Sequence, residues 1–323
     1  MDESVELRSW DEMIPDALGL IFRKLSLQDI LTVVPRVCKS WRRAVSGPYC
    51  WQEIEIVEWC RGCKPEQITR MLQMLIPRSS GSLRKLCVSS LPNDQAFQYI
   101  ADHAVSLQTF ELPKSAISDC IVEQVAAKLS NVTFLDVSYC VKMGACALEA
   151  FGKHCKFLVG LRRAMNPAEV IDIICQDDEA HAIASSMPKL KHLEMAYLLL
   201  TDGGVLEILA GCRYLEFLDI RGCWGVKLGQ KFMKEKYSGL KVLGPVDWEV
   251  NYWDDYSDFS DSSGYLAWEL MDDDDDIVGD YYDGFSDVDG EWDDEQALEE
   301  LELRFYEDGF NDASVALDWP PSP

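Results

Sequence analysis

The chain offers few side chains whose types and spacing could perform chemistry. It has four histidines, at His103, His154, His181 and His192. No two of them have the spacing of metal ligands, and Cys60 with Cys63 forms a CxxC pair without the second pair of a zinc site. The sequence contains neither a glycine-rich phosphate loop nor a nucleophile beside a base. We therefore expect a non-catalytic protein with no metal and no cofactor.

Acidic residues are concentrated at one end of the chain. The net charge is −26, and residues 247–323 hold 27 of the 56 acidic residues but only one of the 30 basic ones. Residues 1–246 are therefore balanced in charge. Because no run of Lys and Arg could neutralise phosphates, we expect no direct binding of nucleic acid. The acidic segment would also repel anionic membranes.

Targeting signals and disulfides are not expected. No apolar stretch reaches the ~18 residues needed to span a bilayer. Asp2, Glu3 and Glu6 near the start do not fit a signal peptide. The twelve cysteines mostly stand beside apolar residues and are not paired at short spacing, which favours buried free thiols in a reducing compartment. We expect the protein in the nucleus, the cytoplasm or both.

Residues 10–50 predict three short amphipathic helices. Pro15 suits a first helical turn, Ser26 is a candidate cap for a helix restart, and Pro35 begins another turn. About forty residues can hardly bury all of this apolar surface alone, so we expect the module to be stabilised by another domain or a partner.

A recurring frame in residues 51–246 predicts leucine-rich repeats. The frame is apolar-x-x-apolar-x-apolar, and its copies start at Trp51, Leu83, Leu107, Val132, Leu190 and Leu215, with degenerate copies at Leu158 and Leu240. A period near 25 residues with one short strand and one helix in each unit is typical of this solenoid. We expect Ser118 and Thr201 to cap helices, and the stretch 164–187 to be the longest insertion.

The N-terminal residues resemble the F-box motif along its whole length, from Ile14-Pro15-Asp16 to Val37-Cys38-Lys39-Ser40-Trp41. The family pattern usually opens with Leu-Pro and has Glu two residues after the proline, where Ala17 stands here. The resemblance implies binding to a Skp-type adaptor, which links the receptor to cullin and RING subunits. The residues to which it gives this role are Ile14, Pro15, Leu18, Ile21, Phe22, Leu25, Ile30, Leu31, Val34, Val37 and Trp41. Alternatively, they form only an internal three-helix core.

The repeats look like the cysteine-containing leucine-rich repeats often found behind F-boxes, because Cys140 and Cys223 follow their strands at the same offset. Target selection would then come from strand positions that alternate away from the core and line the concave surface. These positions are Lys85, Cys87, Thr109, Glu111, Phe134, Asp136, Ser138, Arg162, His192, Glu194, Phe217, Asp219 and Arg221.

The whole sequence is thus expected to be an α/β protein of the plant F-box/leucine-rich-repeat type. Its parts are an N-terminal extension (1–9), a three-helix F-box (10–50), a short repeat solenoid (51–246) and an acidic, largely disordered tail (247–323). The resemblance implies the substrate-recognition subunit of a Skp–cullin–F-box ubiquitin ligase, which brings a target protein to ubiquitination and proteasomal degradation. The alternative is a scaffold or chaperone, outside any ligase, that binds basic proteins through its tail. In that tail, 291–307 could form an amphipathic helix, and Trp248, Tyr252 and Trp253 could cap the solenoid.

Overall fold

The structure is a computed structural model that describes residue 10, residues 13–165 and residues 175–245. The expected N-terminal extension and acidic tail lie outside the described residues. So do the expected helix at 291–307 and the solenoid cap at Trp248, Tyr252 and Trp253.

The N-terminal module consists of short helical segments. α1 spans Pro15–Phe22, a π-helical turn at Asp29–Val33 leads into α2 at Val34–Val37, and α3 spans Lys39–Ser46. The expected cap is present, since Ser26 Oγ accepts from the Asp29 amide at 3.1 Å. Cys38 Sγ accepts from the Trp41 amide at 3.4 Å and caps α3 in the same way.

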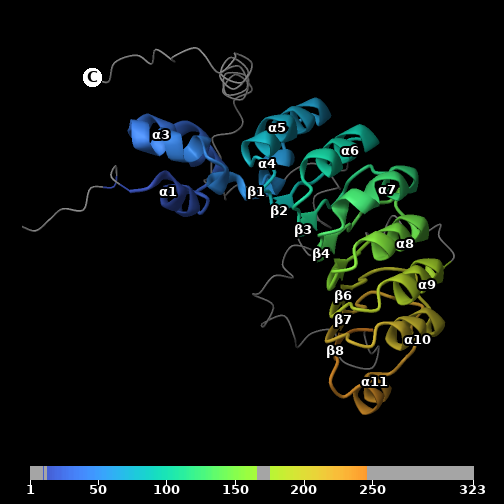
Figure 1. The fold of residues 1–323 in the computed structure, drawn as a ribbon. Helices are drawn as coiled ribbons and strands as arrows, with labels where there is room; N and C mark the ends of the chain where they lie inside the picture. The colour runs from blue at the N-terminus through green and yellow to red at the C-terminus, as the bar shows by residue number, and fades with distance from the viewer. Residues whose placement is uncertain (1–9, 11–12, 166–174, 246–323) are drawn as a thin grey trace, which may run out of the picture. The chain divides into compact units, whose positions relative to one another are not determined.

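Eight short strands follow and form one parallel sheet in sequence order (Figure 1). They are β1 Glu53–Glu55, β2 Lys85–Cys87, β3 Thr109–Glu111, β4 Phe134–Asp136, β5 Gly160–Arg162, β6 His192–Glu194, β7 Phe217–Asp219 and β8 Lys241–Leu243. The middle residue of β2 to β7 is fully buried in every case. Each strand therefore contributes one apolar side chain to a continuous core.

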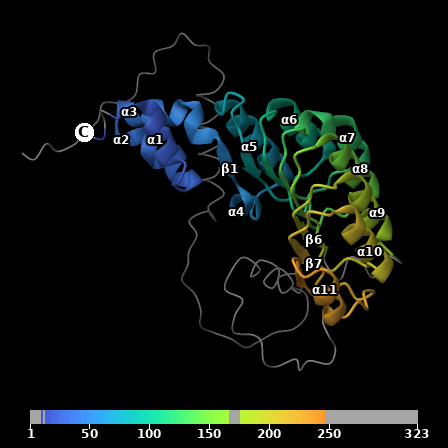
Figure 2. The same ribbon diagram turned by 60° about the horizontal axis from the view of Figure 1, so that its bottom comes forward.

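The helices of the repeats line one side of this sheet (Figures 1 and 2). They are α5 Pro65–Arg78, α6 Asp94–His103, α7 Asp119–Val125, α8 Ala145–His154, α9 Asp177–Ser186, α10 Asp202–Gly211 and α11 Gln230–Lys236, while the single turn α4, Val57–Cys60, directly follows β1. Within the described part of the chain, none of the helices has the length and apolar character needed to cross a bilayer.

The predicted frame matches the register of seven strands and is wrong by one residue in the eighth. Leu218 pairs with Val242, where the frame starting at Leu240 predicts Leu243. Because Leu240, Val242 and Leu243 are all apolar, two registers satisfy the pattern, and only the pairing with β7 selects one.

Repeated polar contacts join each unit to the next. Asp94 accepts from the amide and hydroxyl of Ser118 at 2.9 and 2.6 Å. Asp177 repeats this contact with Thr201 at 2.9 and 2.5 Å. Ser118 and Thr201 are themselves the helix caps expected from the sequence. A carboxylate at one helix start thus fixes the next helix start, which sets the spacing of the repeats.

The buried cysteines also bond to the preceding repeat. Cys140 Sγ donates to the Leu112 carbonyl at 3.2 Å, and Cys223 Sγ donates to the Met195 carbonyl at 3.1 Å. Burial raises the pKa of each of these thiols to about 12. They therefore remain protonated donors, and their role in the described structure is structural.

The fifth repeat departs from the frame because Arg163 takes the place of an inward apolar residue. Its guanidinium is buried and pairs with the Glu179 carboxylate through two bonds of 2.9 and 3.0 Å. It also donates to the carbonyls of Val137, Cys140 and Met143. The expected insertion at 164–187 is wrong in extent, because α9 supplies the regular helix of this repeat from Asp177 onward. Residues 166–174 lie outside the described residues.

We predict that Arg163→Ala lowers the free energy of unfolding by about 3–5 kcal/mol, because it leaves the buried Glu179 carboxylate without its cation. Replacing both members by Met should recover part of that loss. Urea denaturation of the variants measures the effect, with Lys191→Ala, which breaks an exposed ion pair, as a control expected to cost at most about 1 kcal/mol. A loss for Arg163→Ala no larger than this control would contradict the role of the buried pair.

Candidate protein-interaction surfaces

The N-terminal module exposes several large apolar side chains. They include Trp10, Ile14, Leu20, Ile21, Leu25, Val33 and Val37. Ile14 is 68% exposed and Val37 is 54% exposed, although both are aliphatic. Ile14 and Ile21 are seven residues apart and so lie on one side of α1. We call these seven residues the apolar surface.

The core of the module is filled by other side chains. Leu18, Phe22, Ile30 and Val34 are all at most 5% exposed. Phe22 packs against Trp41, with ring centroids 4.8 Å apart. The expected direct adaptor contact of Leu18, Phe22, Ile30 and Val34 is therefore corrected, because their side chains form the inner face of the module. Pro15, Leu31 and Trp41 are half-buried.

Trp10, Leu20 and Val33 belong to the apolar surface but were not expected from the motif. Leu20 lies beside Ile21 in α1. Val33 is the last residue of the π-helical turn, and the turn changes the direction in which its side chain points before α2 begins. A strict 3.6-residue period does not account for that turn. Only the unusual density of aliphatic residues in 30–37 could have indicated it.

The module is attached to the first repeat through Trp51. Its indole is buried, donates from Nε1 to the Val45 carbonyl at 2.6 Å and lies 5.3 Å from the Arg78 guanidinium. Arg23 of the module pairs with Glu53 of β1 at 3.3 Å. The expected stabilisation by another part of the chain is thus present, and the apolar surface remains exposed nonetheless.

The sheet face opposite the helices carries a row of rings. The His192 and Phe217 rings stack with centroids 4.4 Å apart and planes at 4°. Lys241 lies 5.6 Å from the centroid of Phe217. Phe134 occupies the space beside Gly160, where an added Cβ would come within 2.5 Å of the ring. Gly160 therefore lets the Phe134 ring lie flat across β5, with the Arg162 guanidinium 5.7 Å from its centroid.

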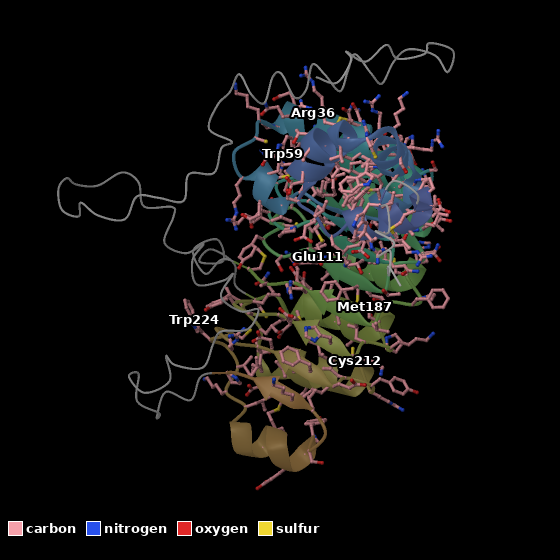
Figure 3. The ribbon with its side chains drawn as sticks, turned by 90° about the vertical axis from the view of Figure 1, so that its left-hand side faces the viewer. Arg36, Trp59, Glu111, Met187, Cys212 and Trp224 are labelled. Carbon is pink, nitrogen blue, oxygen red and sulfur yellow. The ribbon has the colours of Figure 1, made fainter. Side chains whose placement is uncertain are left out.

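A second row on this face consists of charged residues, and Arg162 is its centre. The guanidinium donates to both oxygens of Glu194 at 2.7 and 3.2 Å and to Asp136 at 3.2 Å. His192 Nε2 lies 2.5 Å from Glu194 Oε1. Further along, Arg221 pairs with Asp219 at 2.6 Å. Glu111 lies in the same row on β3, near the middle of the molecule in Figure 3.

Four of the positions expected on this surface are corrected, because the structure buries them. They are Cys87, Asp136, Ser138 and Asp219. They alternate away from the core as expected, but none of them is more than 4% exposed. Asp136 and Asp219 accept from backbone amides two residues ahead, at 2.9 and 3.0 Å, and so hold the strand ends. The half-buried positions are Lys85, Thr109, Glu111, Phe134, Arg162, His192, Glu194, Phe217 and Arg221.

Burial and pairing move the pKa values of these carboxylates in opposite directions. Burial raises the pKa of Glu111, and the nearby Asp136 charge raises it further. Burial also raises the pKa of Asp136, against the effect of Arg162. For Glu194, burial acts upward, but hydrogen bonds from His192 and Arg162 prevail and lower its pKa to about 2. The centre of the row is therefore an ion-paired cluster.

Metal binding has no support in the part of the chain that the structure describes. No group of three or more His, Cys, Asp or Glu side chains there could hold an ion. What the described surfaces offer is aromatic rings, fixed charges and aliphatic side chains, which suit recognition of other proteins.

Comparison with known proteins agrees with this arrangement. The F-box-like family matches residues 15–56. F-box protein FBW2 of Arabidopsis thaliana is 52% identical over 332 residues, covering 100% of both chains. Putative F-box/LRR-repeat protein 23 of the same plant is 31% identical over 240 residues, covering 74% of this chain and 53% of that protein. F-box protein SKIP19, also from Arabidopsis, is 30% identical over 300 residues, covering 88% and 94%.

Among solved structures, the crystal structure of the Rad7 and Elc1 complex in yeast aligns with a TM-score of 0.39 and 18% identity. It covers 53% of this chain and 44% of that chain.

Short helices with an exposed apolar face, joined to stacked strand–helix repeats, define an adaptor protein that binds other proteins. The chain belongs to the F-box family, as a plant-type F-box/leucine-rich-repeat protein. Proteins of this family are in general non-catalytic and act as substrate receptors of Skp–cullin–F-box ubiquitin ligases.

We predict that Glu194→Gln lowers the free energy of unfolding at neutral pH and makes that free energy decrease less as the pH is lowered. The folded pKa of Glu194 is about 2 and its ordinary value is 4.5, so its stabilising effect is complete above 4.5 and is lost as the pH falls toward 2. Urea denaturation between neutral pH and pH 3 measures this. Glu216→Gln, at an exposed ion pair, is the control and should parallel the unmodified chain. Parallel curves for Glu194→Gln would show that the Arg162 cluster does not hold this carboxylate ionised.

Proposed function

We propose that this chain is the substrate-recognition subunit of a Skp–cullin–F-box ubiquitin ligase. The apolar surface binds a Skp-type adaptor, through which cullin and RING subunits are joined. The repeats bind a target protein, which is then ubiquitinated and degraded by the proteasome. The observation that carries the proposal is the exposed aliphatic surface on a module whose own core is already filled.

The energetics favour a protein partner for the apolar surface. Burying one aliphatic side chain contributes about 1.5–3 kcal/mol relative to leaving it exposed. Contiguous exposed apolar patches on soluble proteins mark interaction sites. Ile14, Ile21, Leu25 and Val37 would contact the adaptor directly, while Leu18 and Phe22 hold the helices in place. This division supports both readings of the motif, since some residues form a core and others form an interface.

The open face of the sheet supports target binding. Its rings at Phe134, His192 and Phe217 are held by stacking and by nearby cations, so little side-chain entropy remains to be lost on binding. Aromatic and Arg side chains are the usual anchors of protein interfaces. We assign the target contact to the half-buried members of this face, including Lys85, Thr109, Glu111, Arg162, Glu194 and Arg221.

The chemistry of ubiquitin transfer would belong to other subunits, and this chain would contribute proximity between the target and the charged enzyme. The twelve free cysteines support placing the protein in a reducing compartment, the nucleus or the cytoplasm.

The test is adaptor binding by Ile14→Asp and Val37→Asp variants of the full chain. Asp suits the N-cap position that Ile14 occupies before α1, so the helix should persist while the apolar contact is lost. We expect the affinity for a Skp-type adaptor to fall at least about 100-fold in each variant, with an unchanged melting temperature, measured by calorimetry.

Val105→Asp is the matched control, because this similarly exposed valine lies at the end of the second repeat, outside the apolar surface. It should bind the adaptor normally. The ligase proposal fails if the unmodified chain does not bind a Skp-type adaptor. It also fails if the Ile14 and Val37 variants bind as well as Val105→Asp.

A further inference from the structure

At one edge of the sheet, each helix ends and the next strand begins. The types of exposed side chain at this edge differ between the earlier and the later repeats. The strand register makes Phe157, Lys189 and Tyr214 equivalent, since each stands three residues before the paired Gly160, His192 and Phe217. Phe157 is 61% exposed and Tyr214 is 67% exposed. An aromatic–cation–aromatic row thus runs across three successive repeats.

The fold does not require these side chains. The same register places Ser82, Ser106 and Asn131 at the equivalent position of the preceding three repeats. Those small polar residues line a shallow depression together with Arg84 and Gln108. Since Ser and Asn satisfy the backbone geometry there, the large exposed rings at 157 and 214 have another cause than folding.

The row is flanked by further cations. Lys156, Lys191, Arg213 and Lys241 are all exposed on the segments 155–160, 187–192, 212–217 and 238–241. Within these segments the only carboxylate is Glu216, 2.8 Å from Lys191. We call Lys156, Phe157, Lys189, Lys191, Arg213, Tyr214 and Lys241 the basic edge.

Lysines of the basic edge are oriented by backbone carbonyls. Lys189 Nζ donates to the Lys156 carbonyl at 3.3 Å, and Lys156 Nζ donates to the Gly152 carbonyl at 3.0 Å. A carbonyl positions an ammonium group without cancelling its charge, so the Lys189 cation is held against the backbone of the preceding repeat. In Figure 3, Met187 and Cys212 are labelled to the right of Trp224, and Lys189 and Arg213 follow them in the sequence.

We propose that the basic edge binds an acidic segment of the target protein that also carries apolar side chains. The inference rests on the proposed function and adds the chemical class of the target. Charges of one sign are spread along a line, which fits Asp and Glu residues of an extended peptide, and the intervening rings fit apolar residues between them. A single phosphate would instead need donors that converge on one point.

The test measures binding of a fluorescein-labelled peptide of alternating Glu and Leu to the full chain by fluorescence anisotropy. Phe157→Ser/Lys189→Ser/Tyr214→Ser introduces the residue type that earlier repeats have at this position, so the variant should fold. We expect its affinity for the peptide to fall at least about tenfold. Lys156→Glu/Lys189→Glu should weaken binding similarly and make it less sensitive to salt.

Two controls give the test its specificity. Lys142→Glu/Lys227→Glu makes the same change of charge at the opposite edge and should leave the affinity unaltered. A peptide with Ser in place of Leu should bind more weakly, which tests the rings. Equal losses in both Glu double variants would mean general electrostatic attraction and would overturn the proposal.

Other outcomes would also overturn it. The first is that the Glu–Leu peptide does not bind, including the case in which residues 247–323 already occupy the basic edge. The second is that a phosphopeptide or an oligonucleotide binds more tightly than the Glu–Leu peptide. Adaptor binding is measured on the same variants and should not change. If the unmodified chain does not bind the adaptor, the ligase role is refuted. If it binds the adaptor but not the peptide, only the proposed role of the basic edge is refuted.

Discussion

The structure depends on the stacking of one apolar side chain from each strand. Leu86, Phe110, Leu135 and Leu161 are fully buried only because a neighbouring repeat covers each of them. A three-residue strand with one short helix cannot bury such a side chain alone, so the units are stable only as a stack. The stack then dictates everything on its surface, because equivalent positions of successive repeats line up in rows.

The same constraint explains the N-terminal module. Its helices are too few to form an independent core, and the chain meets this need by joining them to the first repeat through Trp51. The joint covers only one side of the module. Ile14 and Val37 stay in solvent, which is an unfavourable arrangement for an isolated chain and a favourable one for a chain with a partner.

Buried charge is used in two ways along the solenoid. Arg163 lies inside the core, at a position where the frame has an apolar residue. Its guanidinium bonds to Glu179 of α9 and to the Met143 carbonyl in the loop after β4. Arg162, its neighbour, points to the opposite face and holds Asp136 and Glu194 in an ion-paired cluster. The last residue of β5 and the residue after it therefore serve the binding face and stability separately, because successive side chains of an extended segment point to opposite sides.

By itself, the sequence determined the class of fold, the caps at Ser26, Ser118 and Thr201, and the positions of seven strands. These are local or periodic features, and a period of about 25 residues leaves little freedom in how the units pair. It did not determine which apolar residues of the motif are exposed, since Leu18 and Ile21 look alike until the helices pack.

Tertiary structure alone decided which strand positions of the open face are buried, as at Asp136 and Asp219. It also decided the register at Leu240. No run of basic residues is present in the sequence, yet stacking brings Lys156, Lys189 and Arg213 from three repeats to one edge. Residues about 25 or more positions apart become neighbours only when the solenoid forms, and no local pattern contains that information.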